Sequence, residues 1–291
     1  MNMLPPQQPA TSNQQPAAQR QSALLLMVVA ALFVIVSFLF WHESWFGRRL
    51  SNREIDQYLI DDQHPHKIQH ALSQIADRIG QRDHAVKRWY PQVMALARHS
   101  SSEIRITAAW VMGQDPSSNE FHQVLRELLD DPALMVRRNA ALELVRFRDA
   151  SGRAEVVKML QSYSVRAPDQ GRVSIQLAED QAVATGTRLA RIMQDSKSQI
   201  EVRSPLSGRI QSILAQNGAM VMTGDELMRI DSDADQVWEA LRGLYLVGRS
   251  EDLPDVERYA SGVSNMPDRI REQAILTAKA IQTRARLNAN Q

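Results

Sequence analysis

The order of hydrophobic and polar residues divides the chain into stretches of different periodicity, the first of which is residues 23–41. This stretch, ALLLMVVAALFVIVSFLFW, is an unbroken apolar run in which Ser37 is the single polar side chain. Its 19 residues, at about 1.5 Å each in a helix, cover the hydrocarbon layer of a bilayer, which is about 30 Å thick. The run therefore predicts one N-terminal transmembrane helix at 23–41.

The residues on either side of this run support an anchor that stays uncleaved. Residues 1–22 are rich in Pro, Gln and Ser and lack apolar periodicity, which predicts a disordered tail. Trp41 and Trp45 follow at the depth of an interfacial aromatic belt. The apolar run is too long for a signal peptide, and no small-x-small cleavage pattern follows it.

Helical periodicity begins after the predicted anchor and shows a repeating layout. In DDPALMVRRNAALEL we expect Asp131 as the N-cap of a helix and Pro132 at its first position. Val136, Ala140 and Ala141 then share one helical face. The stretch SSEIRITAAW repeats this layout 32 residues earlier, and a weaker copy surrounds Ala71. The same pattern returns after residue 232 at Ala240 and Ala274, which are 34 residues apart.

Periods of this size indicate stacked helical pairs. The Asp-Pro, Val-Arg, Ala-Ala layout resembles HEAT repeats, which predicts an α-solenoid over 51–161 and again over 234–285. The resemblance also suggests that an arginine after the β-branched residue, such as Arg105 or Arg137, reaches the acidic turn of a neighbouring repeat. A helical bundle without repeats is the alternative.

Between the helical stretches the period changes to that of short strands. Residues 165–192 and 202–230 are copies of each other: Pro168 matches Pro205 at an offset of 37, and Gly186 matches Gly224 at an offset of 38. Two such copies predict a pseudo-twofold β domain over 164–231, with a glycine turn before the last strand of each half.

This paired layout resembles the biotinyl/lipoyl domain, a barrel-sandwich hybrid that also occurs in membrane fusion proteins, the periplasmic adaptors of export pumps. The expected fold class is thus multidomain: an α-solenoid of HEAT-like repeats, an all-β barrel-sandwich hybrid inserted into it, and one transmembrane helix. Adaptors of that kind often carry a long helical hairpin between the two β halves. Here only the eight residues 193–200 separate them.

The biotinyl/lipoyl resemblance singles out Lys197 as the one candidate cofactor-binding residue. Carrier domains bear the modified lysine in the hairpin between their halves, eight residues before the proline that opens the second half, and Lys197 and Pro205 have this spacing. The flanking residues differ, because carriers resemble Met-Lys-Met or Asp-Lys-Ala and this chain has Ser196-Lys197-Ser198. We therefore expect an unmodified lysine at a hairpin tip and no cofactor, and a lipoyl or biotin carrier modified at Lys197 is the alternative.

Two clusters of polar residues offer other chemistry. His64, His66 and His70 follow two aspartates, and the i, i+4 spacing of the last two histidines would suit a metal sensor. We expect instead polar residues of a solvated loop and helix start, since no glutamate lies between these histidines as in the zinc-protease motif. The run RRNAALELVRFR holds Arg137, Arg138, Arg146 and Arg148, which either clasp an anionic partner or spread around the exposed side of a helix. We expect no metal site.

Composition and missing motifs exclude several classes of function. With 34 Lys and Arg against 33 Asp and Glu, the net charge of +1 gives no case for nucleic acid. The chain has no cysteine, which excludes disulfides, thiolate metal sites and a cysteine nucleophile. It also lacks a phosphate-binding loop, a Gly-x-Ser-x-Gly elbow and paired carboxylates in a catalytic context, so we expect no catalytic residues and no enzyme.

These features together predict a noncatalytic, membrane-anchored scaffold or adaptor of an envelope complex of the transport or secretion kind. The expected partners are the membrane and other envelope proteins, and self-association as a homo-oligomer stays open. The anchor would be a single pass in the inner (cytoplasmic) membrane. Arg48, Arg49 and Arg53 after the span favour a cytoplasmic carboxyl side, whereas the cysteine-free chain and the adaptor resemblance favour the periplasm, which we expect.

Overall fold

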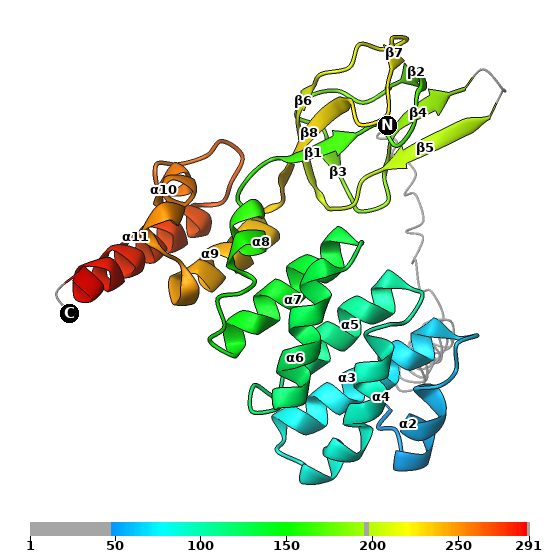
Figure 1. Ribbon diagram of the computed structural model, residues 1–291, viewed down its shortest axis with the longest axis vertical. Helices are drawn as coiled ribbons and strands as arrows, with labels where there is room; N and C mark the ends of the chain where they lie inside the picture. The colour runs from blue at the N-terminus through cyan, green and yellow to red at the C-terminus, as the bar shows by residue number, and fades with distance from the viewer. Residues whose placement is uncertain (1–47, 195–197, 290–291) are drawn as a thin grey trace, which may run out of the picture. The chain divides into compact units, whose positions relative to one another are not determined.

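The structure is a computed structural model that describes residues 48–194 and 198–289 (Figure 1). The predicted tail at 1–22 and the predicted transmembrane helix at 23–41 lie outside these residues. Among the helices that the structure describes, none has both the length and the apolar character needed to cross a membrane. The chain divides into two compact units at residue 51, and the second unit, residues 52–291, holds the elements described below.

The helices of this unit are arranged as pairs. After α2 (Asn52–Tyr58), α3 (Pro65–Gly80) and the 3-10 helix η2 (His84–Trp89), the pairs are α4 (Tyr90–Leu96) with α5 (Ser102–Met112), α6 (Asn119–Glu127) with α7 (Leu134–Arg146), α8 (Arg153–Lys158) with α9 (Ala234–Val247), and α10 (Leu253–Ala260) with α11 (Asp268–Ala289). Short 3-10 helices, η3 (Leu128–Asp130) and η4 (Ser250–Asp252), precede α7 and α10. The second helices also contact one another in the order α3, α5, α7, α9, α11, which is the stacking expected of helical repeats.

The small residues that define the repeat pattern lie at the helix contacts. Seven alanines on the predicted faces are 0% exposed: Ala71, Ala108, Ala109, Ala140, Ala141, Ala240 and Ala274. A methyl group at these positions lets two helices approach closely, so the alanine spacing correctly predicted which face of each helix is buried.

One helix start differs from the prediction. Helix α7 begins at Leu134 with Ala133 as its N-cap, so Asp131 and Pro132 precede the helix. Asp131 has an extended backbone, with ψ of 139°, and its carboxylate Oδ1 accepts a hydrogen bond of 2.8 Å from the N–H of Ala133. The aspartate therefore caps the turn before the helix, where it is also within reach of the preceding repeat.

The β domain consists of two four-stranded sheets. Its strands are β1 (Tyr163–Arg166), β2 (Gly171–Ser174), β3 (Ala182–Val183), β4 (Arg188–Met193), β5 (Gln199–Arg203), β6 (Gly208–Ile213), β7 (Met220–Val221) and β8 (Glu226–Ser232). The sheet orders are β1-β8-β6-β3 and β5-β4-β2-β7. Exchanging each strand of the first half for its counterpart in the second converts one sheet order into the other, which confirms the predicted pseudo-twofold.

The two halves share one apolar core. Val173 and Ile192 of the first half and Ile210 and Ile230 of the second belong to one buried cluster between the sheets. The matched turn glycines of the two halves also have the same backbone conformation. Gly186 and Gly224 have φ of 83° and 90°, values that residues other than glycine rarely adopt. The halves are thus interwoven within one β body.

The β domain interrupts a helical pair. The chain leaves α8, forms all eight strands and returns into α9, which packs on both α7 and α8 (Figure 1). Leu134, at the start of α7, belongs to the apolar core of the β domain. The insertion therefore has a packed junction with the helices.

Candidate functional site

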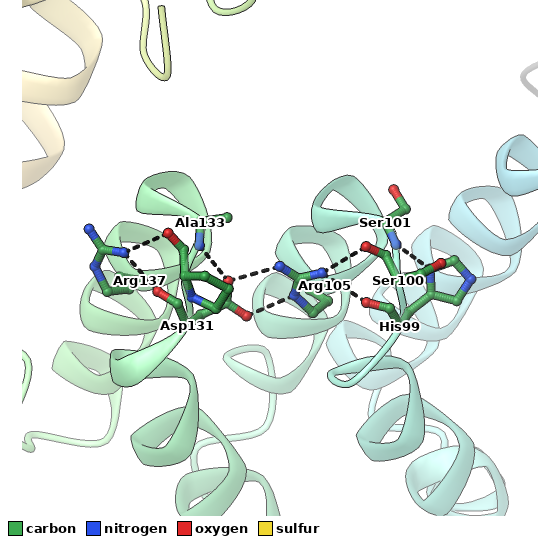
Figure 2. A network of polar contacts seen from close by, with 8 residues as sticks. His99, Ser100, Ser101, Arg105, Asp131, Ala133 and Arg137 are labelled. Atoms are coloured by element: carbon green, nitrogen blue, oxygen red, sulfur yellow. Dashed lines mark hydrogen bonds and ion pairs between the residues drawn. The ribbon is translucent and has the colours of Figure 1, made fainter. Parts of the chain in front are cut away.

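An ionic ladder connects successive repeats at their turns (Figure 2). The guanidinium of Arg105 donates two hydrogen bonds to the Asp131 carboxylate, from Nε to Oδ2 at 2.7 Å and from Nη2 to Oδ1 at 2.9 Å. Its Nη1 donates to the backbone oxygens of His99 at 2.8 Å and Ser100 at 3.1 Å. The side chains of Arg105 and Asp131 are 12% and 6% exposed. This contact confirms that the arginine reaches the acidic turn of the neighbouring repeat.

The electrostatics of this contact favour the ion pair. Burial raises the pKa of Asp131, but the hydrogen bonds from Arg105 and from the N–H of Ala133 outweigh burial and leave the pKa below its ordinary value. A two-point contact between a guanidinium and a carboxylate also fixes their relative orientation. The pair therefore sets how the α4–α5 repeat sits on the α6–α7 repeat.

The ionic contact between neighbouring repeats is longer next to the inserted β domain. Arg137, the counterpart of Arg105, donates to the backbone oxygens of Asp131 and Pro132 at its own turn, and its Nε lies 3.9 Å from Oε1 of Glu155 in α8. Arg153 of α8 then reaches the turn before α10, where its Nη1 donates to Oδ1 of Asp252 at 2.5 Å. Ionic contacts thus continue across the split pair.

A groove with a volume of about 740 Å³ lies over the second helices of the repeats. Its lining comes from α5, α7, α9 and α11, with no contribution from the first helices or from the β domain. Four large hydrophobic residues of the lining are exposed: Trp110 by 38%, Tyr245 by 44%, Leu246 by 57% and Leu276 by 54%. Exposed apolar side chains gathered in a concave place are typical of a site where another molecule binds.

Lys197 lies outside the described residues, but both strands that lead to it are described. Strands β4 and β5 pair as far as Met193 and Gln199, and beyond them the N–H of Gln194 donates to the backbone oxygen of Ser198 at 3.0 Å. Three residues, 195–197, connect these paired ends. The β4–β5 hairpin joins the two halves of the domain, as the biotinyl/lipoyl resemblance implies for the carrier lysine.

His64 and His70 of the N-terminal histidine cluster have separate partners. His64 Nδ1 lies 2.8 Å from Oδ1 of Asp61, and the His70 ring lies beside the Tyr58 ring at 6.4 Å between centroids. Hydrogen bonds from Lys67 and His64 lower the pKa of Asp61 to about 2. Within 48–194 and 198–289, no three His, Asp or Glu side chains are placed to hold a metal ion. The structure therefore gives the metal-sensor alternative at His64, His66 and His70 no assembled ligand set among the described residues.

The arginines of α7 also differ from the expectation that they spread around the exposed side. Arg138 is 1% exposed, and its Nη1 donates to Gln236 Oε1 and, at 3.3 Å, to Ser232 Oγ. These acceptors lie where the chain leaves β8 and enters α9. Arg146 is half-exposed at the groove instead. Arg138 and Arg146 therefore lie at two different places, one at the β8–α9 junction and one at the groove.

Comparisons with known families agree with this architecture. Residues 57–146 and 90–173 match the family described as HEAT repeats, and residues 164–230 match the family described as biotin-requiring enzyme, of the biotin/lipoyl type. The chain thus contains HEAT repeats and a biotinyl/lipoyl-like domain, modules with a protein-interaction or carrier role.

Comparisons with whole proteins add little to this result. No curated protein matches the chain. A solved structure described as "Structure and function of a single-chain, multi-domain long-chain acyl-coa carboxylase" is similar with 22% sequence identity and a TM-score of 0.24. The match covers 34% of this chain and 11% of the carboxylase. A likeness at that TM-score carries no argument about function.

Proposed function

We propose that the protein is a noncatalytic, membrane-anchored adaptor of an envelope complex and that it binds protein partners through the groove over α5, α7, α9 and α11. The groove is the observation that carries this proposal, since it presents Trp110, Leu246 and Leu276 to solvent on the repeats. Stacked helical repeats commonly offer such extended surfaces to other proteins.

The apolar run at 23–41 supports the membrane part of the proposal. A helix of that length inserts effectively irreversibly, and tethering raises the local concentration of the groove near membrane partners. The orientation with the soluble part in the periplasm belongs to the same proposal, as does assembly with other envelope proteins.

We expect a photo-reactive amino acid at Leu246 to form crosslinks to envelope proteins in intact cells, because this side chain is exposed in the groove. The full chain should remain in the membrane fraction after high-salt and alkaline washing, and a chain without residues 23–41 should not. A photo-reactive residue at Ile60, which is 73% exposed but outside the groove lining, is the matched control. Equal crosslinking from both positions would contradict the groove, and a full chain released by washing would contradict the anchor.

A carrier role at Lys197 is the second candidate, favoured by the family match at 164–230 and by the spacing from Lys197 to Pro205. The residues beside Lys197 do not resemble those of carriers, so we expect the intact mass of protein purified from its native host to show no lipoyl or biotinyl group. The Lys197→Arg chain is the control. An added mass of either group, absent from that variant, would establish the carrier role and displace the adaptor proposal.

A further inference from the structure

Glu143 of α7 lies in the lining of the groove. The packing of the helical repeats does not require a carboxyl group at this position. The residue is 8% exposed, and within the described part of the chain its Oε2 accepts no hydrogen bond. The nearest cation is Nε of Arg146, at 3.6 Å from Oε2. Burying a carboxylate without a hydrogen-bond donor costs free energy. An apolar side chain at this place would serve the packing of α7 better.

The pKa of Glu143 reflects the burial of its carboxylate without a hydrogen-bond donor. Burial, with a smaller contribution from Glu239, raises the pKa of Glu143 to about 7 although the nearby Arg146 lowers it in part. The pKa of Asp131, in the turn before the same helix, shifts in the opposite direction, because Arg105 supplies the hydrogen bonds that Glu143 lacks. A cationic hydrogen-bond donor placed at Glu143 would therefore stabilise its ionised carboxylate.

The neighbouring helix makes room for this carboxyl group. Gly113 is the C-cap of α5, and a Cβ atom on it would lie 1.8 Å from Glu143 Oε2. The carboxyl group therefore packs on the glycine backbone, and the 11% of the side chain that remains exposed belongs to the groove. An energetically unfavourable group held in place by close packing is typical of a functional position.

The other charged residues of the groove already have acceptors or donors. Arg146 Nη2 donates to Gln114 Oε1 at 3.3 Å, and Arg242 Nη1 donates to Glu239 Oε1 at 3.4 Å. Both arginines are about half-exposed, as is Glu239. Arg146 is thus the cation beside Glu143, but within the described residues no group donates a hydrogen bond to Glu143 Oε2. The arginines of the groove already have acceptors, and its exposed apolar side chains favour apolar contacts.

We propose that the groove binds a segment of a protein partner in which a lysine or arginine is flanked by apolar residues, with the cation on Glu143 and the apolar side chains against Trp110, Leu246 and Leu276. This proposal rests on the adaptor function and names the chemistry of its partner. A charge-assisted hydrogen bond that becomes buried on binding is worth more than one in water, which would make Glu143 the main determinant of specificity.

Binding of this kind depends on pH in one direction. The cation pairs with the ionised carboxylate, so below the pKa of Glu143, about 7, binding must first release a proton. The dissociation constant should therefore rise by up to about tenfold for each pH unit below that value. The charged groups that face Glu143 are Arg146 of its own helix and Glu239 of α9, and arginine does not titrate in this range.

The test uses the full chain in detergent and three matched helical peptides of about four turns. Each carries leucines along one face and differs at one central position, which is lysine, norleucine or glutamate. We expect the lysine peptide to bind about tenfold or more tightly than the norleucine peptide at pH about 8, as expected for one charge-assisted hydrogen bond. At pH about 5.5, or with Glu143→Gln, the difference should fall below about threefold. Binding of none of the peptides, or a lysine preference that persists in Glu143→Gln, would overturn the proposal.

Two further variants and the crosslinking assay separate this proposal from the adaptor function. Leu276→Ser should weaken binding of the lysine peptide, whereas Ile275→Ser, which is 48% exposed on the same helix but outside the groove lining, should not. Equal weakening by both would place the peptide elsewhere and overturn the proposal. Crosslinking from Leu246 in cells that is unchanged by Glu143→Gln would retain the adaptor function and reject the role of Glu143.

Discussion

Replacing Arg105 with alanine should destabilise the helical repeats by about 3–5 kcal/mol, the range found when one partner of a buried ion pair is removed. The variant leaves the Asp131 carboxylate, 6% exposed, without its two hydrogen bonds from the guanidinium. It also removes the donor to the backbone oxygens of His99 and Ser100. Urea unfolding followed by circular dichroism measures the loss.

The exposed pair of Arg98 and Glu127 provides the control. It also joins two repeats, with 2.9 Å between Nη2 and Oε2, but its side chains are 72% and 51% exposed. Such pairs contribute about 0–1 kcal/mol, so Arg98→Ala should change stability little. Similar losses for Arg98→Ala and Arg105→Ala would contradict the importance assigned to burial and two-point geometry.

The contribution of Arg105 should also depend on pH. The folded protein holds the pKa of Asp131 below its ordinary value of 3.8. A lowered acid pKa stabilises the folded state above the ordinary value, and that stabilisation is lost as the pH falls through the lowered pKa. The difference between the wild type and Arg105→Ala should therefore be largest near neutral pH and shrink below pH 3.8. A difference that stays constant down to that range would show that Arg105 acts through packing alone.

The sequence predicted the features that repeat along the chain. Matched residues such as Gly186 and Gly224 predicted two equivalent β halves, and alanines at repeat spacing, such as Ala108 and Ala140, predicted the buried helix faces. A pattern that occurs twice constrains both copies, because each must bury the same face. The Arg105–Asp131 contact followed from the same logic, since Arg105 matches Arg137 of the next repeat and Asp131 lies in the acidic turn that opens that repeat.

The features that the sequence patterns did not predict depend on contacts between segments far apart in the chain. Glu143 and Gly243 line the same groove although they are 100 residues apart, because the β domain separates α8 from α9 in sequence but not in space. The sequence around Gly113 did not indicate that this glycine leaves space for the carboxyl group of Glu143 on the next repeat. Arg138 looked like a surface residue because its acceptors lie about a hundred residues later in the chain, at the end of the inserted domain and just after it.

Arg138 provides the second large prediction, which concerns the junction between the helices and the β domain. Its side chain is buried, its Nε has no hydrogen-bond partner within the described residues, and burial lowers its pKa. Arg138→Ala would leave a cavity and orphan the oxygens of Ser232 and Gln236, which should cost about 3–5 kcal/mol. Arg138→Met fills most of the volume and removes the buried charge but orphans the same two oxygens, so it should cost less than Arg138→Ala, about 1–3 kcal/mol.

Amide hydrogen exchange, followed in peptides that cover the end of β8 and the start of α9, measures the loss of stability at this junction. We expect Arg138→Ala to raise exchange in these peptides and to leave the Arg105–Asp131 turn unchanged, because Arg138 contacts Ser232 and Gln236. Arg138→Met should retain most of the protection. If both variants lose protection equally, the charge and its hydrogen bonds hold the β domain on α7. If only alanine does, the junction depends on the volume that the arginine side chain fills.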